Sequence, residues 1–307
     1  MTQYIIRRLL QMVPITFGII TLIFALIHLV PGDPAVQIAG ENARPEDVRQ
    51  VRHALGLDLP LGTQYLNYLV RLAHGDLGTS FQTNEKVSTQ IRQRYPATIE
   101  LAFGAMCVAL LVAFPLGIVS AIYRNSWIDN VARFFALIGV SMPSFWFGPL
   151  LIIAFAIKVN WFPVSGRDEA LRSLVLPSMT MGLALAAILT RMIRVSLAEE
   201  LNQLYVTTAI AKGVTRAKAI FRHALKNALI PVITVLALQF GSLLTGAIIT
   251  EQIFSWPGLG RLLLQSISQR DYPQVQASIL VIALTYIGVN FFSDLLYGVV
   301  DPRIKLE

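Results

Sequence analysis

The sequence predicts an all-α integral membrane protein with six transmembrane helices. Hydrophobic residues make up 55% of the 307 residues, charged residues only 14%, and the mean hydropathy is +0.61. A soluble domain carries about 25% charged residues, so this composition is typical of a chain that lies in lipid. Several apolar runs also reach roughly 20 residues, the length that a helix needs to cross the hydrocarbon core.

The six predicted spans cover approximately residues 9–30, 98–122, 131–158, 174–195, 229–251 and 275–298. The first apolar run is longer than the roughly 7–15-residue core of a signal peptide, so we interpret it as a retained span. Pro115, Pro143 and Pro149 are expected to interrupt the second and third spans. Such breaks are tolerated where neighbouring helices or a cavity satisfy the freed backbone groups.

Positive residues predict the orientation. Arg7, Arg8, Arg124, the basic loop after the fourth span, and Arg303 with Lys305 at the tail all fall on one side. Lysine and arginine gather in cytoplasmic loops, so both termini are expected in the cytoplasm. This bias also accounts for the net charge of +7. Nucleic-acid binding is not expected, because no basic soluble domain with interleaved aromatic residues is visible.

Residues 31–97 are expected to form a small, mostly helical external subdomain between the first two spans. The segment is mixed in charge, with seven Lys/Arg and seven Asp/Glu. Two stretches, "PEDVRQVRHALGL" and "LGTQYLNYLVRL", have apolar residues at helical spacing. Loops of this length cross the membrane regardless of charge, so the segment agrees with the predicted topology.

The loop "YVTTAIAKGVTRAKAIFRHALKNALIP", residues 205–231, carries five Lys/Arg and no acid. It reads as two helices with a reversal at Gly213, where a residue with positive φ commonly closes a helix, and with Thr215 placed to cap the second helix. Leu201, Leu204, Tyr205 and Thr208 make a weak face on the first helix. The second has an apolar face and a cationic face at helical spacing, formed by Ala217, Ile220, Phe221, Ala224, Leu225 and Ala228, and by Lys218, Arg222 and Lys226.

Three interpretations of this hairpin stay open on physical grounds. A basic amphipathic helix beside a membrane can lie on anionic lipid. The positive charge can also serve only to fix topology. The third interpretation is a protrusion that docks in a groove of a partner protein.

The same loop resembles the cytoplasmic EAA loop of bacterial ABC-transporter permeases, in the form found in the dipeptide/oligopeptide/nickel importer family. Similar family character appears along nearly the whole chain and in family order. The stretches are "LVPGDP", "ALGLDLPLGTQY", "GDLGTSF", "YPATIELA", "SMPSFW", "LPS", "FSWPGLGRLL", "RDYPQVQA" and "DPRI".

This resemblance implies a type I ABC importer permease fold with a core over 98–307, after a first span in 1–30 and the external segment 31–97. It implies a second homologous permease, two ATPase subunits that bind ATP and Mg, an extracytoplasmic binding protein, and a bacterial cytoplasmic membrane location. The coupling loop would cover about 199–229. The residues that match its motif are Thr207, Thr208, Ala209, Lys212, Gly213, His223, Leu225, Asn227 and Pro231.

The loop departs from the wider family pattern at four positions. The glutamate that names the loop is Thr207 here, and the following alanine is Thr208. Ile210 stands where the peptide-importer form often has a basic residue, and Lys226 replaces a proline. Small side chains and shape, rather than a glutamate, are therefore expected to carry docking.

A catalytic role is not expected. The chain lacks a GxxxxGK[ST] phosphate-binding motif, and "WPGLGRLL" reads as a turn and helix start on the outer side. An intramembrane hydrolase would need a nucleophile–base pair, but the four histidines (His28, His53, His74 and His223) lie at a span end or in loops. Scattered histidines, with Cys107 expected to be a small core residue, also give no metal site.

An ion-coupled secondary transporter is the main alternative. Such proteins place carboxylates near the bilayer midplane, whereas Glu100, Glu251 and Asp294 lie nearer the span ends. Asp294 is expected to pair with a cation or to cap the inner end of the sixth span.

Polar residues inside the spans are candidates for a translocation path. Each could instead make only interhelical hydrogen bonds. The candidates are Ser141, Ser144, Gln239, Ser242, Thr245 and Asn290. The resemblance implies a dipeptide or short oligopeptide as cargo, with glutathione, nickel complexes or opines as alternatives.

Overall fold

A computed structural model of the chain describes residues 2–29, 34–39, 43–54 and 56–300. All regular elements within these ranges are helical, apart from one isolated bridge between Thr79 and Lys86. This confirms the predicted all-α class. Part of the "LVPGDP" stretch and the tail with "DPRI", Arg303 and Lys305 lie outside the described residues.

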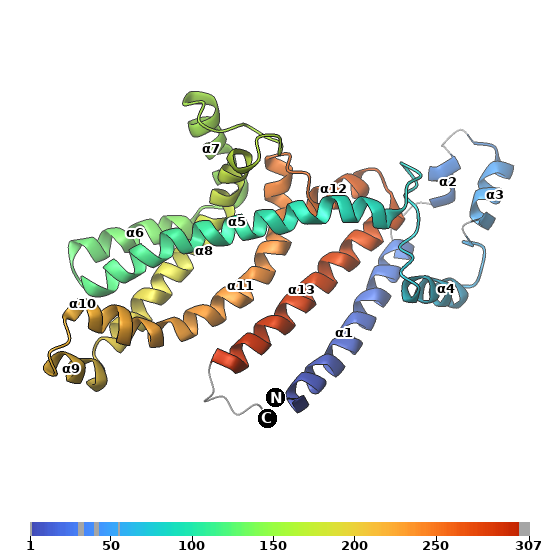
Figure 1. The fold of residues 1–307 in the computed structure, drawn as a ribbon. Helices are drawn as coiled ribbons and strands as arrows, with labels where there is room; N and C mark the ends of the chain where they lie inside the picture. Colours follow the sequence, from blue (N-terminus) through green and yellow to red (C-terminus); the bar gives the residue numbers. More distant parts are fainter. Residues whose placement is uncertain (1, 30–33, 40–42, 55, 301–307) are drawn as a thin grey trace.

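The elements follow one another in this order: α1 (Thr2–Leu29), α2 (Pro34–Ala39), α3 (Pro45–Ala54), α4 (Leu61–Ala73), α5 (Val87–Ile122), α6 (Trp127–Ser141), α7 (Ser144–Leu151), η1 (Ile152–Lys158), α8 (Leu171–Glu200), α9 (Leu204–Ala211), α10 (Arg216–Lys218), η2 (Ala219–Ala224), α11 (Leu225–Ile253), α12 (Leu259–Ser268) and α13 (Tyr272–Val300). The helical stretches predicted in the external segment correspond to α3 and α4. Figure 1 shows α2 to α4 and α12 toward one end of the long helices and α9 with α10 toward the other.

Five helical segments are long and apolar enough to cross a membrane: α1, α5, α8, the continuous segment from α10 to α11, and α13. The pair α6 and α7–η1 makes a sixth span if it is counted as one, and its two halves are bent by 104°. The predicted number of six spans therefore depends on this bent pair.

The proline predictions were right at Pro143 and wrong at Pro115 and at Pro149, which lies inside α7. Helix α6 ends at Ser141, and α7 begins at Ser144 with Pro143 as the residue before it. The helix is therefore broken at Pro143, as predicted. Pro115, by contrast, lies inside an unbroken α5. Helix α5 packs against α8 more extensively than any other pair of elements, and this neighbour holds the helix together despite the missing N–H.

Small side chains explain the close packing of α5 on α8. Ala97, Ala105, Ala109 and Ala113 recur at intervals of four or eight residues and are all fully buried. A Cβ added to Gly182 of α8 would lie 2.5 Å from the carbonyl oxygen of Ala105. Small residues at this spacing let helix backbones approach closely in lipid, where packing rather than hydrophobicity drives association.

Helix α1 is the least embedded of the spans. Only 6% of its apolar window is buried, with Ile23 as its buried contact. It packs mainly on α13, and Arg8 forms a 3.1 Å ion pair with Asp294. Asp294 was expected either to pair with a cation or to cap the sixth span, and the first of these is confirmed.

Asp271, just before α13, ties the segment that precedes α5 to the bundle. Its carboxylate accepts hydrogen bonds from the Ser80 hydroxyl and from the Phe81 backbone N–H, the latter at 3.1 Å. Two residues almost 200 positions away in the sequence are thus fixed at the start of α13. The segment that precedes α5 is therefore anchored to the bundle.

Candidate functional site

The basic loop forms the predicted helix–glycine–helix hairpin. Helix α9 ends at Ala211, and Gly213 has φ of +90°. The N–H of Val214 donates to the carbonyl of Ala209 at 3.1 Å, which closes the end of α9. No atom lies within 4 Å of a Cβ built on Gly213, so the glycine is needed for its backbone conformation and not for space.

The inner face of the hairpin packs on the ends of α5 and α8. Val206 of α9 is 1% exposed, and Ala219, Ala224 and Ala228 from the second arm are as deeply buried. They form one cluster with Ala121, Leu197 and Ala198. Alanines here bring the hairpin backbone close to the ends of the two spans.

The predicted apolar faces were partly wrong. Leu204 is 83% exposed and Phe221 is 58% exposed, and Ala217 is also exposed. The hairpin bends onto α5 and α8 with Val206 and Ala219 inward, which turns these three side chains away. Helical periodicity alone does not specify which side of a two-faced helix meets its neighbours.

Tyr205 joins the two arms of the hairpin. Its hydroxyl donates to a carboxylate oxygen of Glu200 and accepts a hydrogen bond from the Asn227 amide at 3.1 Å. Burial, followed by the Glu200 carboxylate, raises the pKa of Tyr205. Asn227, a residue matched to the family motif, thus fixes the second arm against the first.

Thr207, at the glutamate position, and Thr208, at the following alanine position, turn their hydroxyls back onto their own helix. Thr207 and Thr208 both donate to the carbonyl oxygen of Leu204, at 2.9 and 2.6 Å. Thr215 has the backbone conformation of an N-cap residue but makes no side-chain cap hydrogen bond, contrary to expectation. Its carbonyl instead accepts from Ala219 N–H at 2.9 Å, and this bond opens the second helix.

The other motif-matched residues are spread over the hairpin. Lys212 is exposed at the end of α9 and Ala209 is half-buried, while Pro231 lies inside α11. His223 and Leu225 are half-buried in the second arm.

The outer surface of the hairpin combines exposed apolar groups with exposed cations: Leu204, Ile210, Phe221, Lys218, Arg222 and Lys226. A mixed surface of this kind is suited to a protein partner.

The candidate path residues lie on four elements, α6, α7, α11 and α13. Ser141 and Ser144 flank the break between α6 and α7. Gln239, Ser242 and Thr245 follow one another along α11, where the Ser242 hydroxyl donates to the Gln239 carbonyl at 2.8 Å and the Thr245 hydroxyl to the Ser242 carbonyl at 3.1 Å. Asn290 of α13 faces Gly241 of α11. Among the described residues, no hydrogen bond joins these groups into one site.

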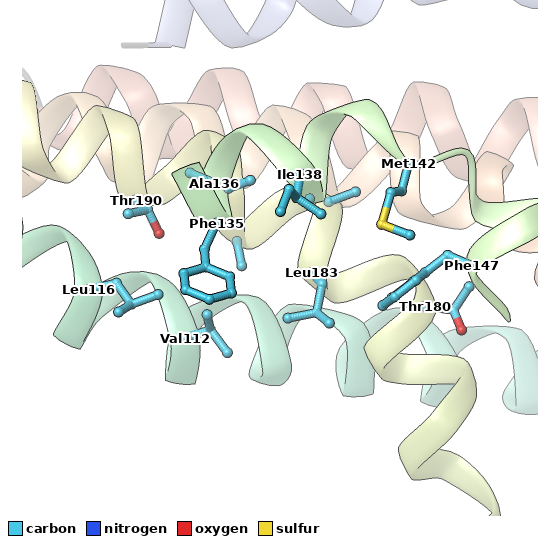
Figure 2. Close-up of a pocket in the computed structure, with 14 residues that line it drawn as sticks. Val112, Leu116, Phe135, Ala136, Ile138, Met142, Phe147, Thr180, Leu183 and Thr190 are labelled. Carbon is cyan, nitrogen blue, oxygen red and sulfur yellow. The ribbon is translucent and has the colours of Figure 1, made fainter. Parts of the chain in front are cut away.

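An apolar cavity of about 300 Å³ lies between α5, α6, α7 and α8. Figure 2 shows the Phe135 ring pointing from α6 toward Val112 and Leu116 of α5. Thr180, on its wall, donates its hydroxyl to the carbonyl of Leu176 in its own helix. Sequence reasoning missed this cavity because its lining carries no polar pattern, and none of the six candidate path residues lines it.

Helices α5 and α11 meet in a buried polar junction, at the end of α11 opposite the hairpin. Glu251, fully buried, accepts from the Thr98 hydroxyl at 2.6 Å and from the Arg261 N–H at 2.9 Å. Thr98 in turn accepts from the Leu259 N–H at 2.8 Å, and Trp256 donates to the Ala97 carbonyl at 2.8 Å. The predicted helix start in "WPGLGRLL" is therefore real: α12 begins there with its free N–H groups satisfied.

The carboxylates weighed for ion coupling already have partners. Glu100 pairs with Arg167 at 2.5 Å, Asp294 with Arg8, and Glu251 with the junction donors. No group of three His, Cys, Asp or Glu side chains close enough to hold a metal occurs in the described part of the chain.

Cys107 is exposed rather than buried, contrary to expectation, because its side of α5 faces away from α8.

The fold is that of a membrane subunit of a type I ABC importer. The chain aligns with structures of the inward-facing MetNI methionine ABC transporter, with a TM-score of 0.59 over 69% of this chain and 96% of that chain at 16% identity. A second MetNI crystal form gives a TM-score of 0.58. At this identity the likeness concerns the fold.

The chain belongs to the family of binding-protein-dependent transport system inner membrane components, whose model matches residues 113–306. The model of the corresponding N-terminal region of such membrane components matches residues 1–102. The chain is 43% identical to the dipeptide transport system permease protein DppB of Alkalihalophilus pseudofirmus, over 99% of this chain and 100% of that protein. It is 41% identical to the glutathione transport system permease protein GsiC of Escherichia coli, over the full length of both.

Family membership decides among the alternatives drawn from the sequence. The chain is a transport permease subunit and a multi-pass membrane protein, rather than a secondary transporter or an intramembrane hydrolase. Permeases of this family work with partner ATPases, a second permease and a substrate-binding protein.

Proposed function

We propose that this chain forms half of the translocation path of an ATP-driven importer of dipeptides or short oligopeptides. Two full-length relatives support this cargo, because one is a dipeptide transport permease and the other a glutathione transport permease. Glutathione, a tripeptide, is the nearest alternative, and nickel complexes and opines are further ones.

The proposed assembly contains a second homologous permease, two ATPase subunits that bind ATP and Mg, and an extracytoplasmic binding protein. The chain lies in the cytoplasmic membrane of a bacterium with both termini in the cytoplasm, and residues 31–97 form its external subdomain. Figure 1 agrees with this arrangement, because the start of α1, the end of α13 and the hairpin lie toward the same end of the bundle.

The hairpin at residues 204–228 is the observation that carries the coupling role. It presents exposed apolar and cationic side chains outward and packs its alanines on α5 and α8 inward. A partner that pulls on its outer surface therefore acts directly on two spans. The residues proposed for this role are Thr207, Thr208, Ala209, Lys212, Gly213, His223, Leu225, Asn227 and Pro231.

The substitution Gly213→Arg tests this role. A β-substituent at φ of +90° strains the reversal, and a long cation placed there obstructs docking. We expect substrate-stimulated ATP hydrolysis by the reconstituted complex to fall by at least about 100-fold, as for loss of a hot-spot contact, with membrane insertion unchanged.

Gly75→Arg is the matched control for this experiment. Gly75 also has positive φ, +74°, with nothing within 4 Å of its Cβ position, but it lies in the external segment. If Gly213→Arg leaves the stimulated ATPase at the level of the Gly75 variant, the hairpin is not the docking element. The cargo is tested separately, by identifying the ligand that copurifies with the cognate binding protein.

A further inference from the structure

A buried carboxylate at the start of α6 is held by four short hydrogen bonds. Asp129 has no exposed surface. One of its oxygens accepts from the Ser120 hydroxyl at 2.5 Å and from Arg194 Nε at 2.6 Å. The other accepts from the Asn125 N–H at 2.9 Å and from Arg194 Nη2 at 2.7 Å.

These bonds come from three separate parts of the fold. Ser120 is in the last turn of α5, Asn125 is in the turn between α5 and α6 with φ of +63°, and Arg194 is on α8. Arg194 binds both carboxylate oxygens in a fork, a geometry that fixes direction as well as distance. We call the pair of Asp129 and Arg194 the α6–α8 clamp.

The clamp lies directly beside the seat of the hairpin. Ser120 is followed by Ala121, and Arg194 is one helical turn before Leu197. Ala121 and Leu197 both belong to the buried cluster on which the hairpin packs. The same two helix ends therefore carry the hairpin on one side and the clamp on the other.

Away from the clamp, helix α6 packs on α8 around Gly139, where an added Cβ would lie 3.1 Å from the carbonyl oxygen of Leu183, while other apolar side chains of α6 stay exposed. Phe134, Phe135 and Leu137 are each more than 60% exposed in the isolated chain. After α6 the chain bends by 104° into α7, beside the apolar cavity of Figure 2. A shift of α8 can therefore reach the start of α6 through the rigid fork, in addition to the apolar packing around Gly139. Beyond α6 it would reach the bend.

We infer that Asp129 and Arg194 are positioning residues that transmit displacement of the hairpin to α6 and α7. The inference rests on the proposed docking of an ATPase at the hairpin. A buried ion pair that only stabilises the fold would behave differently, because its loss would reduce assembly and activity together.

The substitution Arg194→Lys separates these two roles. Lysine keeps the positive charge but loses the fork, so the hairpin can dock while α6 follows α8 less faithfully. We expect normal copurification of the ATPase and normal basal ATP hydrolysis. Substrate transported per ATP hydrolysed should fall about fivefold to tenfold, the range for a residue on a coupling route.

The matched control is Arg191→Lys, one turn earlier on α8, where the side chain is exposed and makes no ion pair among the residues that the structure describes. Ser120→Ala is a milder second variant that keeps the ion pair and removes one hydrogen bond. It should lower the same ratio by about twofold to threefold, and it applies even if Arg194→Lys does not fold.

The proposed positioning role is refuted if the variants that assemble transport as much substrate per ATP hydrolysed as Arg191→Lys does. A parallel fall of assembly, ATP hydrolysis and transport that leaves the ratio of transport to ATP hydrolysis unchanged also refutes it. Failure of the proposed function has another signature: Gly213→Arg would then retain stimulated ATP hydrolysis. The two failures are therefore distinguishable in the same reconstituted preparation.

Discussion

The junction between α5 and α11 and the hairpin both depend on a glycine, for opposite reasons. At the junction, a Cβ on Gly258 would lie 2.1 Å from Glu251 Oε1, while its φ of −97° suits any residue. In the hairpin, Gly213 has open space around it but φ of +90°. One position is restricted by packing and the other by backbone geometry.

This difference reflects how each region is stabilised. Buried polar groups with complete hydrogen bonding hold the junction, and such networks rigidify a site and tolerate little change. The hairpin is held by small apolar side chains on one face and leaves the other face exposed. The junction is therefore fixed by polar contacts from several elements, whereas the hairpin is held by apolar packing on one face only.

Gly258→Ala gives the largest expected effect on stability. The methyl group would displace the Glu251 carboxyl group from its donors. Each buried group that loses its partner costs about 1 to 3 kcal/mol, so the several groups of the junction together should cost more than any single hydroxyl. Thermal unfolding of the detergent-solubilised protein measures the loss. Gly246→Ala is the control, since nothing lies within 4 Å of that Cβ position and alanine favours a helix. Equal stability of the two variants would show that the junction is loosely packed.

Thr98→Val tests the same junction by removing a single hydroxyl. It leaves the Leu259 N–H without its acceptor and Glu251 without one donor, so we expect a loss of about 1 to 3 kcal/mol in unfolding free energy. Thr234→Val is matched to it, because that hydroxyl donates only to the carbonyl of Ile230 in its own helix. A loss no greater than that of the control would contradict the network.

Gly213→Ala has the smallest expected effect on the fold. No clash occurs, and the strain of an alanine at positive φ costs roughly 1 to 2 kcal/mol. Gly213→Asn should cost less, since asparagine tolerates this conformation. The comparison of the two by thermal unfolding checks whether backbone geometry alone sets the requirement; equal values for alanine and glycine would refute it.

Much of this architecture could be predicted from local sequence. The reversal at Gly213 and the break at Pro143 follow from backbone chemistry that acts within a few residues. Pro115 did not break α5, because its effect depends on the helix packed beside it. The burial of Val206 and the exposure of Leu204 likewise depend on which helices pack against the hairpin. The α6–α8 clamp joins residues 65 positions apart, and no periodicity links an aspartate in one span to an arginine in another.

The pairing of α1 with α13 has a consequence for the synthesis of the chain. The first span finds its main partner in the last, so more than 240 residues separate the end of α1 from the start of α13. At about 5 to 20 residues per second, α1 waits roughly 10 to 50 s in the membrane before α13 is made. During that time its apolar surface is available to lipid, to the insertion machinery or to a neighbouring chain. Its early stability must come from hydrophobic length rather than from helix contacts.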